Sequence, residues 1–324
     1  MPASEEPLDC LIVGAGPAGL TAATYLVRFH RRIAVVDAGQ SRARWIPESH
    51  NCPGFPFGVA GPALLRKLRE QAEGYGAAIT PGRIADLHRE RETFVASDDA
   101  GGSWRARNVI LASGIVDRMP PIEGGAPALE PAIEAGVLRL CAVCDGYEAS
   151  DERIAVYAPA DAAIHHALFL RTFSRRVDAI RAEAGEPSPD CAALARDAGV
   201  VLLPVPTNLQ HDGKECIVDF SDGGTRRYDS VYPVLGVVAQ SQLAAALGAQ
   251  LDDHRELVVD DQQQTSVDGL YAIGDVVSAL NQISVAVGHA AIAATAIHNR
   301  LPRNFREDEA SQPETATELP APGR

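Results

Sequence analysis

The chain has little of what nucleic acids, membranes or export would require. Its 324 residues include 29 Lys and Arg against 43 Asp and Glu, a formal net charge of −14 at pH 7. Because anionic surfaces repel such a chain, we expect neither nucleic acid nor a membrane as a partner. No uninterrupted apolar run approaches the roughly 20 residues of a membrane span. Residues 1–7 have neither the basic nor the apolar region of a signal peptide, so we expect a cytoplasmic protein.

Cysteine is also scarce. Six cysteines are too few for a secreted disulfide scaffold in a chain of this length. Two of them form Cys141-Ala-Val-Cys144, and in a reducing cytosol a C-x-x-C pair indicates redox or metal chemistry. Zinc would need a second ligand pair, and the adjacent His165 and His166 cannot both face one metal from a helix, so we expect no metal. The scattered cysteines are expected to be small buried hydrophobes: Cys10, Cys52, Cys191 and Cys216.

The C-x-x-C pair is followed directly by Asp145. Two cysteines at this spacing can close a small disulfide ring, and the three residues together suit dithiol–disulfide exchange. One thiolate attacks, its partner resolves the mixed disulfide, and the carboxylate moves the proton that keeps a thiol reactive. The structural alternative, a helix-capping role for Asp145, is compatible with this chemistry.

The start of the chain carries a dinucleotide-binding fingerprint in its full context. An apolar strand over residues 8–13 runs into a glycine-rich loop, a helical pattern follows, and a second strand over residues 33–36 ends in an acid. The first two glycines let backbone approach a pyrophosphate at the helix N-terminus, the third packs helix on strand, and the acid binds ribose. The residues of this fingerprint are Gly14, Gly16, Pro17, Ala18, Gly19 and Asp37.

Further periodic segments complete an α/β pattern. A helix is predicted over residues 61–74, and a strand over 108–111 runs into small residues that allow close passage of a cofactor. A second strand–helix–strand unit covers residues 153–180. Near the end, an apolar strand leads into Gly-Asp and a long helix over about 283–299. Other predicted features are strands over 79–85, 93–97 and 230–235, a hairpin around 222–224, and a disordered tail over 304–324.

With the fingerprint, the C-x-x-C-D and the Gly-Asp segment in this order, the chain resembles the low-molecular-weight thioredoxin reductase family of flavoprotein disulfide reductases. The resemblance implies two Rossmann-like three-layer α/β domains, FAD as the cofactor and a homodimer. A discontinuous FAD-binding domain would span residues 1–117 and 237–303. Residues 118–236 would form an inserted domain that resembles a pyridine-nucleotide-binding domain and carries the C-x-x-C.

The resemblance also implies a role for each site residue. Cys144 would lie beside the flavin and exchange electrons with it, Cys141 would attack or release the partner disulfide, and Asp145 would be the general acid–base. The cofactor contacts expected beyond the first fingerprint are Asn51, Ala112, Ser113, Gly114, Gly274, Asp275, Gln282, Ile283 and Ala290.

The second strand–helix–strand unit departs from the family. In place of the G-x-G-x-x-A motif for NADPH, the chain has Ala158-Pro-Ala-Asp-Ala-Ala163. Methyl groups replace both pyrophosphate glycines, and Pro159 removes a backbone N–H donor. In the segment that would grip the 2′-phosphate, only Arg181 remains, and Glu183 would repel a phosphate. We therefore do not expect NADPH to be the electron donor.

Several routes for the electrons stay open. Ferredoxin or flavodoxin could reduce the flavin, which would then reduce a thioredoxin-like protein disulfide through the two cysteines. In a dithiol oxidase, electrons would instead pass from a small-molecule or protein dithiol to FAD and oxygen. A second flavin could occupy the altered nucleotide site, or the tail could cover the flavin with Phe305. A non-enzymatic flavin redox sensor or scaffold is the last alternative, and the intact C-x-x-C-D argues against it.

Overall fold

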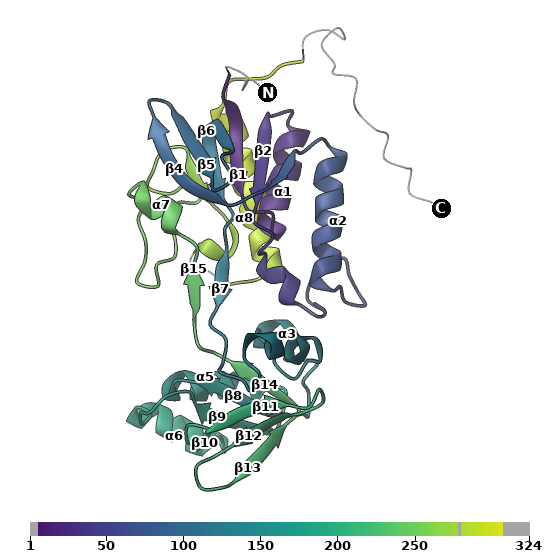
Figure 1. Ribbon diagram of the computed structural model, residues 1–324, viewed down its shortest axis with the longest axis vertical. Helices are drawn as coiled ribbons and strands as arrows, with labels where there is room; N and C mark the ends of the chain where they lie inside the picture. The colour runs from purple at the N-terminus through teal and green to yellow at the C-terminus, as the bar shows by residue number, and fades with distance from the viewer. Residues whose placement is uncertain (1–5, 278–279, 307–324) are drawn as a thin grey trace, which may run out of the picture. The chain divides into compact units, whose positions relative to one another are not determined.

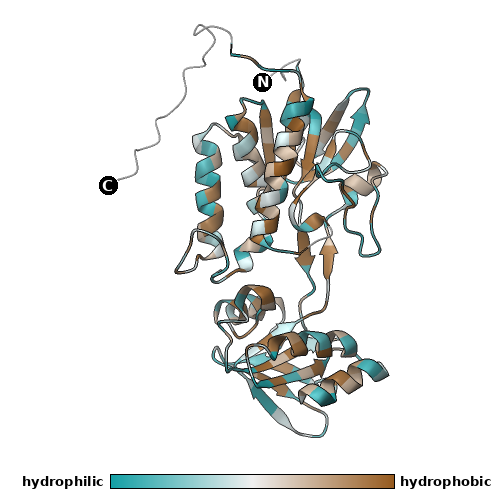
Figure 2. Cartoon of the chain, turned by 180° about the vertical axis from the view of Figure 1, so that it is seen from behind, coloured by the Kyte–Doolittle hydropathy of each residue, from teal (hydrophilic) through white to brown (hydrophobic). Residues whose placement is uncertain are grey.

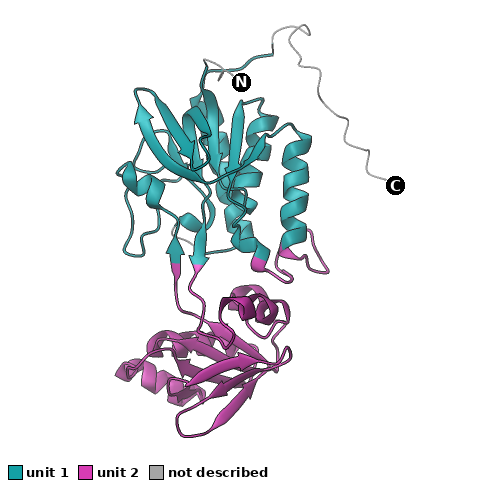
Figure 3. Ribbon diagram, viewed as in Figure 1, with its two compact units in different colours: residues 1–44, 62–116, 238–324 teal, residues 45–61, 117–237 magenta. Residues whose placement is uncertain are grey.

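The computed structural model describes residues 6–277 and 280–306 of the chain (Figure 1). Two compact units are present (Figure 3): Met1–Arg44, Pro62–Val116 and Val238–Arg324 form the first, and Trp45–Gly61 and Asp117–Val237 form the second. Where the chain crosses between them, β7 (Ile115–Asp117) and β15 (Val237–Ala239) pair as a two-stranded sheet. Among the described residues, no helix has both the length and the apolar character needed to cross a bilayer.

The first unit is built on a seven-stranded sheet in the order β3-β2-β1-β6-β5-β4, with β16 also paired to β6. Strand β1 (Leu8–Val13) pairs in parallel with β2 (Ile33–Asp37) and β6 (Ser103–Leu111). Residues 10–13 of β1 are buried, which explains their continuous apolar sequence. The other strands are β3 (Ile79–Pro81), β4 (Ile84–Glu90), β5 (Thr93–Asp98) and β16 (Leu270–Ala272).

Small residues let the helices of the first unit pack closely. In α1 (Pro17–Arg28) and α8 (Ile283–Arg300), alanines supply much of one apolar cluster, which also contains Ile12 and Val35 of the sheet. Figure 2 shows hydrophobic residues along the central strands of this unit. The other helical segments are η1 (Arg42–Trp45), α2 (Gly61–Gly74), α7 (Gln242–Ala246) and η2 (Gly274–Val276).

The second unit has three layers. Its central sheet is parallel, in the order β10-β9-β8-β14, and β8 (Arg153–Ala158) points alternate side chains to opposite faces. Ile154 and Val156 pack against α5 (Ala160–Leu170) and α6 (Pro189–Ala198). The alternate residues Ala155 and Tyr157 pack in a cluster with α3 and the antiparallel sheet β11-β12-β13. The remaining bounds are α3 (Ala126–Glu134), α4 (Ala142–Asp145), β9 (Arg176–Arg181), β10 (Val201–Leu203), β11 (Asn208–His211), β12 (Cys216–Asp219), β13 (Thr225–Tyr228) and β14 (Ser230–Pro233).

The α/β fold with Rossmann-like sheets is confirmed, with three local differences. The strand predicted over residues 79–85 is two strands, because β3 pairs with β2 and β4 pairs with β5, at opposite ends of the sheet order, and the chain leaves the first strand after Pro81. Helices α3, α6 and α7 were not predicted, nor were the short strands β7, β10, β11 and β15. Residues 45–61 pack with the second unit, where Trp45 contacts an apolar cluster, although the sequence assigns them to the FAD-binding domain. The domain boundaries stay a prediction.

The tail prediction falls mostly outside the described residues. Residues 307–324 are not described, so their predicted disorder is untested. Phe305 is described, and 71% of its surface is exposed. The Arg303 guanidinium lies 5.7 Å from the centre of its ring.

We expect Gly19→Ala to lower the free energy of unfolding by about 2 kcal/mol, because a Cβ at Gly19 would overlap the backbone carbonyl of Gly14. Urea denaturation measures the change. Gly288→Ala in α8 is the matched control, since no atom lies within 4 Å of its added Cβ. It should stabilise the protein by up to about 1 kcal/mol through helix propensity. Equal effects of the two substitutions would contradict this explanation.

Candidate functional site

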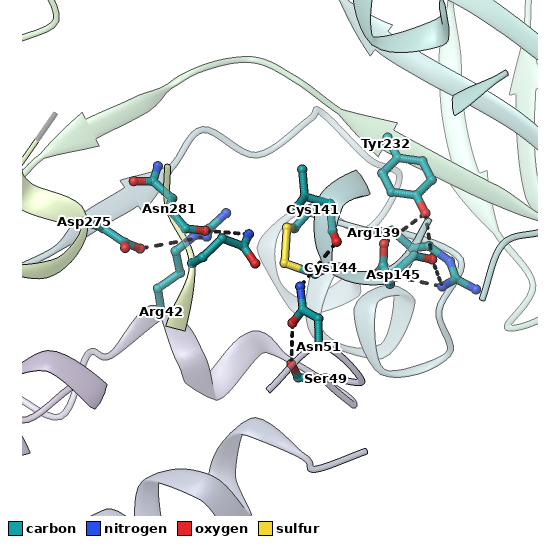
Figure 4. Close-up of a disulfide and its surroundings, with 12 residues drawn as sticks. Arg42, Ser49, Asn51, Arg139, Cys141, Cys144, Asp145, Tyr232, Asp275 and Asn281 are labelled. Carbon is teal, nitrogen blue, oxygen red and sulfur yellow. Dashed lines mark hydrogen bonds and ion pairs between the residues drawn. A yellow bond between two sulfur atoms is a disulfide. The ribbon is translucent and has the colours of Figure 1, made fainter. Parts of the chain in front are cut away.

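The two cysteines of the C-x-x-C pair form a disulfide in the second unit (Figure 4). Cys141 is the extended N-cap residue of the short helix α4, with φ −152° and ψ 97°, and its carbonyl accepts the N–H of Cys144 at 2.9 Å. The two Cα atoms are 5.3 Å apart. Both cysteines are half-buried, and Val143 between them is 49% exposed. A helical turn of this kind brings two cysteines three positions apart into bonding distance.

Asn51 contacts this same turn. Its Nδ2 donates to the carbonyl oxygen of Val143 at 3.3 Å, and the Ser49 hydroxyl donates to its Oδ1 at 3.1 Å (Figure 4). The resemblance places Asn51 near the flavin, and that role stays a prediction. What the structure shows is an amide that holds the backbone between the two cysteines.

Asp145, the last residue of α4, is largely buried, with 20% of its side chain exposed. The Tyr232 hydroxyl donates to its Oδ1 at 2.9 Å, and Arg139 Nη1 lies 3.7 Å from its Oδ2 (Figure 4). Burial raises the pKa of Asp145 to about 6, and Arg139 and the Tyr232 hydrogen bond partly oppose this shift. A carboxyl group with such a pKa can gain or lose a proton near neutral pH.

The other four cysteines are buried and free, as the sequence predicts. Burial raises the thiol pKa of Cys10 and Cys52, and raises that of Cys216 to about 12, so these thiols are poor nucleophiles. Within residues 6–277 and 280–306, no group of three or more His, Cys, Asp or Glu side chains could hold a metal ion.

The first fingerprint forms the turn between β1 and α1. Gly14 has a φ of 104°, and a Cβ there would overlap the Ala112 carbonyl oxygen. A Cβ at Gly16 would lie 3.3 Å from the Ser41 hydroxyl. Pro17 begins α1, and the first turn of this fully described helix holds no acidic side chain. A helix N-terminus that follows a glycine turn and has no acidic side chain in its first turn fits a pyrophosphate.

Two aspartates, each beside an arginine, lie on the same unit as this turn. Asp37 follows β2, where its Oδ1 accepts the Ala15 N–H at 3.0 Å and its Oδ2 lies 3.4 Å from Arg69. Gly274 has a φ of 72°, and its position lets η2 approach α1 at Ala18, whose Cβ would lie 3.0 Å from a Cβ on Gly274. The adjacent Asp275 lies 4.0 Å from Arg42 of η1. Carboxylates for ribose hydroxyls, a glycine turn and a nearby cation together fit FAD.

The remaining predicted cofactor contacts are placed as follows. Ser113 donates its hydroxyl to the Gln240 carbonyl at 2.7 Å, and Gly114, with φ 66°, accepts the Gln240 N–H at 2.9 Å. Gln282 is the N-cap residue of α8, which begins at Ile283. Ala290 is fully buried in the cluster between α1 and α8, where it contributes to helix packing. Their contacts with FAD stay predictions.

The corresponding turn of the second unit differs in charge. Pro159 is the N-cap residue of α5, and Asp161 lies in the first turn of the helix. The Asp161 carboxylate accepts the backbone N–H of Ser188 at 2.8 Å, and this hydrogen bond lowers its pKa, so it is ionised at neutral pH. Arg181, the one arginine left in the predicted phosphate segment, forms an ion pair with Glu186 at 2.7 Å.

Three features of the site were missed by the sequence analysis: Arg42 beside Asp275, Arg139 with Tyr232 around Asp145, and the Asp161–Ser188 hydrogen bond. No motif marks Arg42, Arg139 or Tyr232, because each is brought to its partner by the fold. Asp161 was visible within the altered NADPH loop, but its hydrogen bond reaches 27 residues along the chain.

Comparison with known proteins agrees with this arrangement. Residues 8–290 match the family model described as pyridine nucleotide-disulphide oxidoreductase. Thioredoxin reductase from Peptoclostridium acidaminophilum is 28% identical over 94% of this chain and 100% of its own length. That from Mycolicibacterium smegmatis is 31% identical over 86% and 91%. The crystal structure of thioredoxin reductase from Streptococcus pyogenes MGAS5005 superposes with a TM-score of 0.82 at 25% identity, covering 91% of this chain and 98% of the other. The chain therefore belongs to the pyridine nucleotide-disulphide oxidoreductase family, and within it to the thioredoxin reductases.

Proposed function

We propose that this FAD-dependent disulfide oxidoreductase exchanges electrons between flavin and the Cys141–Cys144 disulfide without using a pyridine nucleotide. FAD, when bound, supplies two-electron oxidation and reduction. The proposed partner is a thioredoxin-like protein disulfide, as the names of the relatives suggest, and the proposed donor is ferredoxin or another non-pyridine reductant. A homodimer in the cytoplasm stays a prediction.

The main observation against NADPH as the electron donor is the ionised carboxylate of Asp161 at the start of α5. A helix N-terminus binds phosphate through free N–H groups and a positive dipole end. Here Pro159 contributes no N–H, and Asp161 places a negative charge in the first turn. Its hydrogen bond to Ser188 keeps that charge in place. A pyrophosphate at this turn would meet a like charge, and Arg181 is already paired with Glu186.

At the dithiol, this chain's own residues supply the proton chemistry. Cys141 is proposed to attack the partner disulfide, and Cys144 to resolve the mixed disulfide that forms. Each thiol must lose a proton before it attacks. Above pH 6 Asp145 is a carboxylate able to accept that proton, and below pH 6 it is an acid able to donate one.

We expect the anaerobic protein to keep its visible flavin absorbance when it is mixed with NADPH or with NADH. It should lose that absorbance with a small dithiol or with reduced ferredoxin. Stopped-flow spectroscopy measures the rate, and dithionite serves as the control that the bound flavin is reducible. Rapid bleaching at low NADPH concentration would sink the proposal. Bleaching by a dithiol, followed by rapid reoxidation by oxygen but not by a thioredoxin-like disulfide, would favour the dithiol oxidase alternative.

The assignment of the two cysteines predicts different spectra for their serine variants. Cys141→Ser should leave Cys144 as a thiolate against the bound flavin and produce a broad absorbance band at long wavelength. Cys144→Ser should produce no such band, because the remaining thiol is the one assigned to the partner. Absorbance spectra at neutral pH compare the two, and indistinguishable spectra would contradict the assignment.

Asp145→Asn should make the protein more stable and less active at the same pH. The folded-state pKa of about 6 lies above the ordinary 3.8, so folding above pH 6 includes the cost of ionising a buried carboxyl group. A pKa raised by about two pH units corresponds to about 3 kcal/mol, and this cost is relieved as the pH falls from about 6 to about 4. The variant should therefore gain up to about 3 kcal/mol of unfolding free energy at about pH 8, with the gain shrinking toward zero near pH 4.

Over the same range, disulfide turnover by Asp145→Asn should fall by about 100-fold, because no carboxylate accepts the thiol proton. Urea denaturation and steady-state kinetics, each at both pH values, measure the two effects. Unchanged turnover at about pH 8 would refute the proton-carrier role.

A further inference from the structure

Arg139 divides its guanidinium among three partners in the second unit. Its Nε donates to the Gly136 carbonyl at 3.1 Å, and its Nη2 donates to Glu152 Oε1 at 3.4 Å. Its Nη1 faces Asp145, at 3.4 Å from the backbone carbonyl and 3.7 Å from Oδ2. The Arg139 side chain is only 15% exposed, so water screens these interactions weakly. One cation therefore serves two carboxylates, Asp145 and Glu152.

Glu152 is an unusual partner for a buried arginine. Its Oε2 is buried and has no hydrogen-bond partner among the described residues, so its interaction with Arg139 runs through Oε1 alone. Its backbone is fixed, because its carbonyl accepts the Ser174 hydroxyl at 2.5 Å. With 27% of its side chain exposed, Glu152 has Arg139 as the ion-pair partner of its carboxylate.

Tyr232 forms a hydrogen bond with Oδ1 of Asp145, whereas Arg139 faces Oδ2. Its ring is 2% exposed on β14, and its hydroxyl donates to Asp145 Oδ1 at 2.9 Å (Figure 4). Donation to a carboxylate stabilises the ionised form. Tyr232 and Arg139 therefore favour the same ionised state of Asp145, each through a different carboxylate oxygen.

We infer that Arg139, Glu152 and Tyr232 are positioning residues that set the pH at which Asp145 exchanges its proton, with Glu152 competing with Asp145 for the charge of Arg139. The inference rests on the proposed function in one respect, which is that Asp145 carries the proton during disulfide exchange. Around Asp145, Tyr232 and Arg139 contact the carboxylate, Glu148 and Glu152 add negative charge nearby, and Arg139 is the cation.

This arrangement predicts shifts of opposite sign. Glu152→Gln removes the competitor and a like charge, so it should lower the titration midpoint of Asp145 by about one pH unit. Tyr232→Phe removes a donor to the carboxylate and should raise the midpoint by a similar amount. Arg139→Gln should also raise it. A residue that only supported the fold would not shift the midpoint in a direction set by its charge.

The midpoint can be measured directly in the FAD-loaded, oxidised protein. Aspartate carrying carbon-13 at its side-chain carboxyl is incorporated, and the Asp145 signal is assigned by its absence in Asp145→Asn. Its chemical shift is then followed by NMR over about pH 4 to 8. This titration does not depend on turnover. Failure of the proposed function would appear separately, as an unchanged pH–rate profile in Asp145→Asn.

Glu148→Gln is the matched control. It makes the same change of charge near Asp145, but Glu148 is exposed and forms no hydrogen bond or ion pair with Arg139 among the described residues. Its shift should be much smaller than that of Glu152→Gln. In the Arg139→Gln background the effect of Glu152→Gln should also shrink, because the shared cation is gone. Equal shifts for the two glutamates, or shifts of the same sign in Glu152→Gln and Tyr232→Phe, would overturn the inference.

Discussion

The first unit depends on the close approach of the backbone at two glycines, where any side chain would overlap a carbonyl group. Gly14 lies against the Ala112 carbonyl, and Gly19 lies against Gly14 itself, so α1 begins directly at the ends of β1 and β6. Because α1 sits this close to the sheet, η2 can approach it at Ala18. The glycine turn, Asp37 and Asp275 are thereby gathered on one unit, and their chemistry suits a dinucleotide.

The chain contains two strand–turn–helix arrangements whose turns differ in residues and in charge. The turn into α1 has glycines and no acid in the first helical turn. The turn into α5 has Pro159 as its N-cap and Asp161 just inside, with its carboxylate bonded to Ser188. The second turn is also shorter, with Pro159 alone between β8 and α5, and it supplies its own anion. This difference supports the proposal of an electron donor other than a pyridine nucleotide, while the fold itself is that of the family.

The dithiol turn combines an exposed face with a buried acid. Val143 is half exposed between the two cysteines, whereas the carboxylate that follows them is held by Tyr232 and Arg139. Burial alone would push the pKa of Asp145 upward, and the two neighbours limit that rise. An acid that titrates near neutral pH is suited to both directions of thiol–disulfide exchange. The surrounding charges are thus part of the site.

The sequence by itself determined the fold class, the C-x-x-C-D segment and the glycine turn, because these depend on local spacing and on residue types with narrow conformational uses. Strand ends were less certain, as the division at Gly82 shows. The sequence could not reveal Arg139 and Tyr232 beside Asp145, or Ser188 beside Asp161. Tyr232 is 87 residues from Asp145 along the chain. Only tertiary structure brought such groups within hydrogen-bond distance, because their contacts arise from sheet order and helix packing, which leave no periodic or spaced pattern in the sequence.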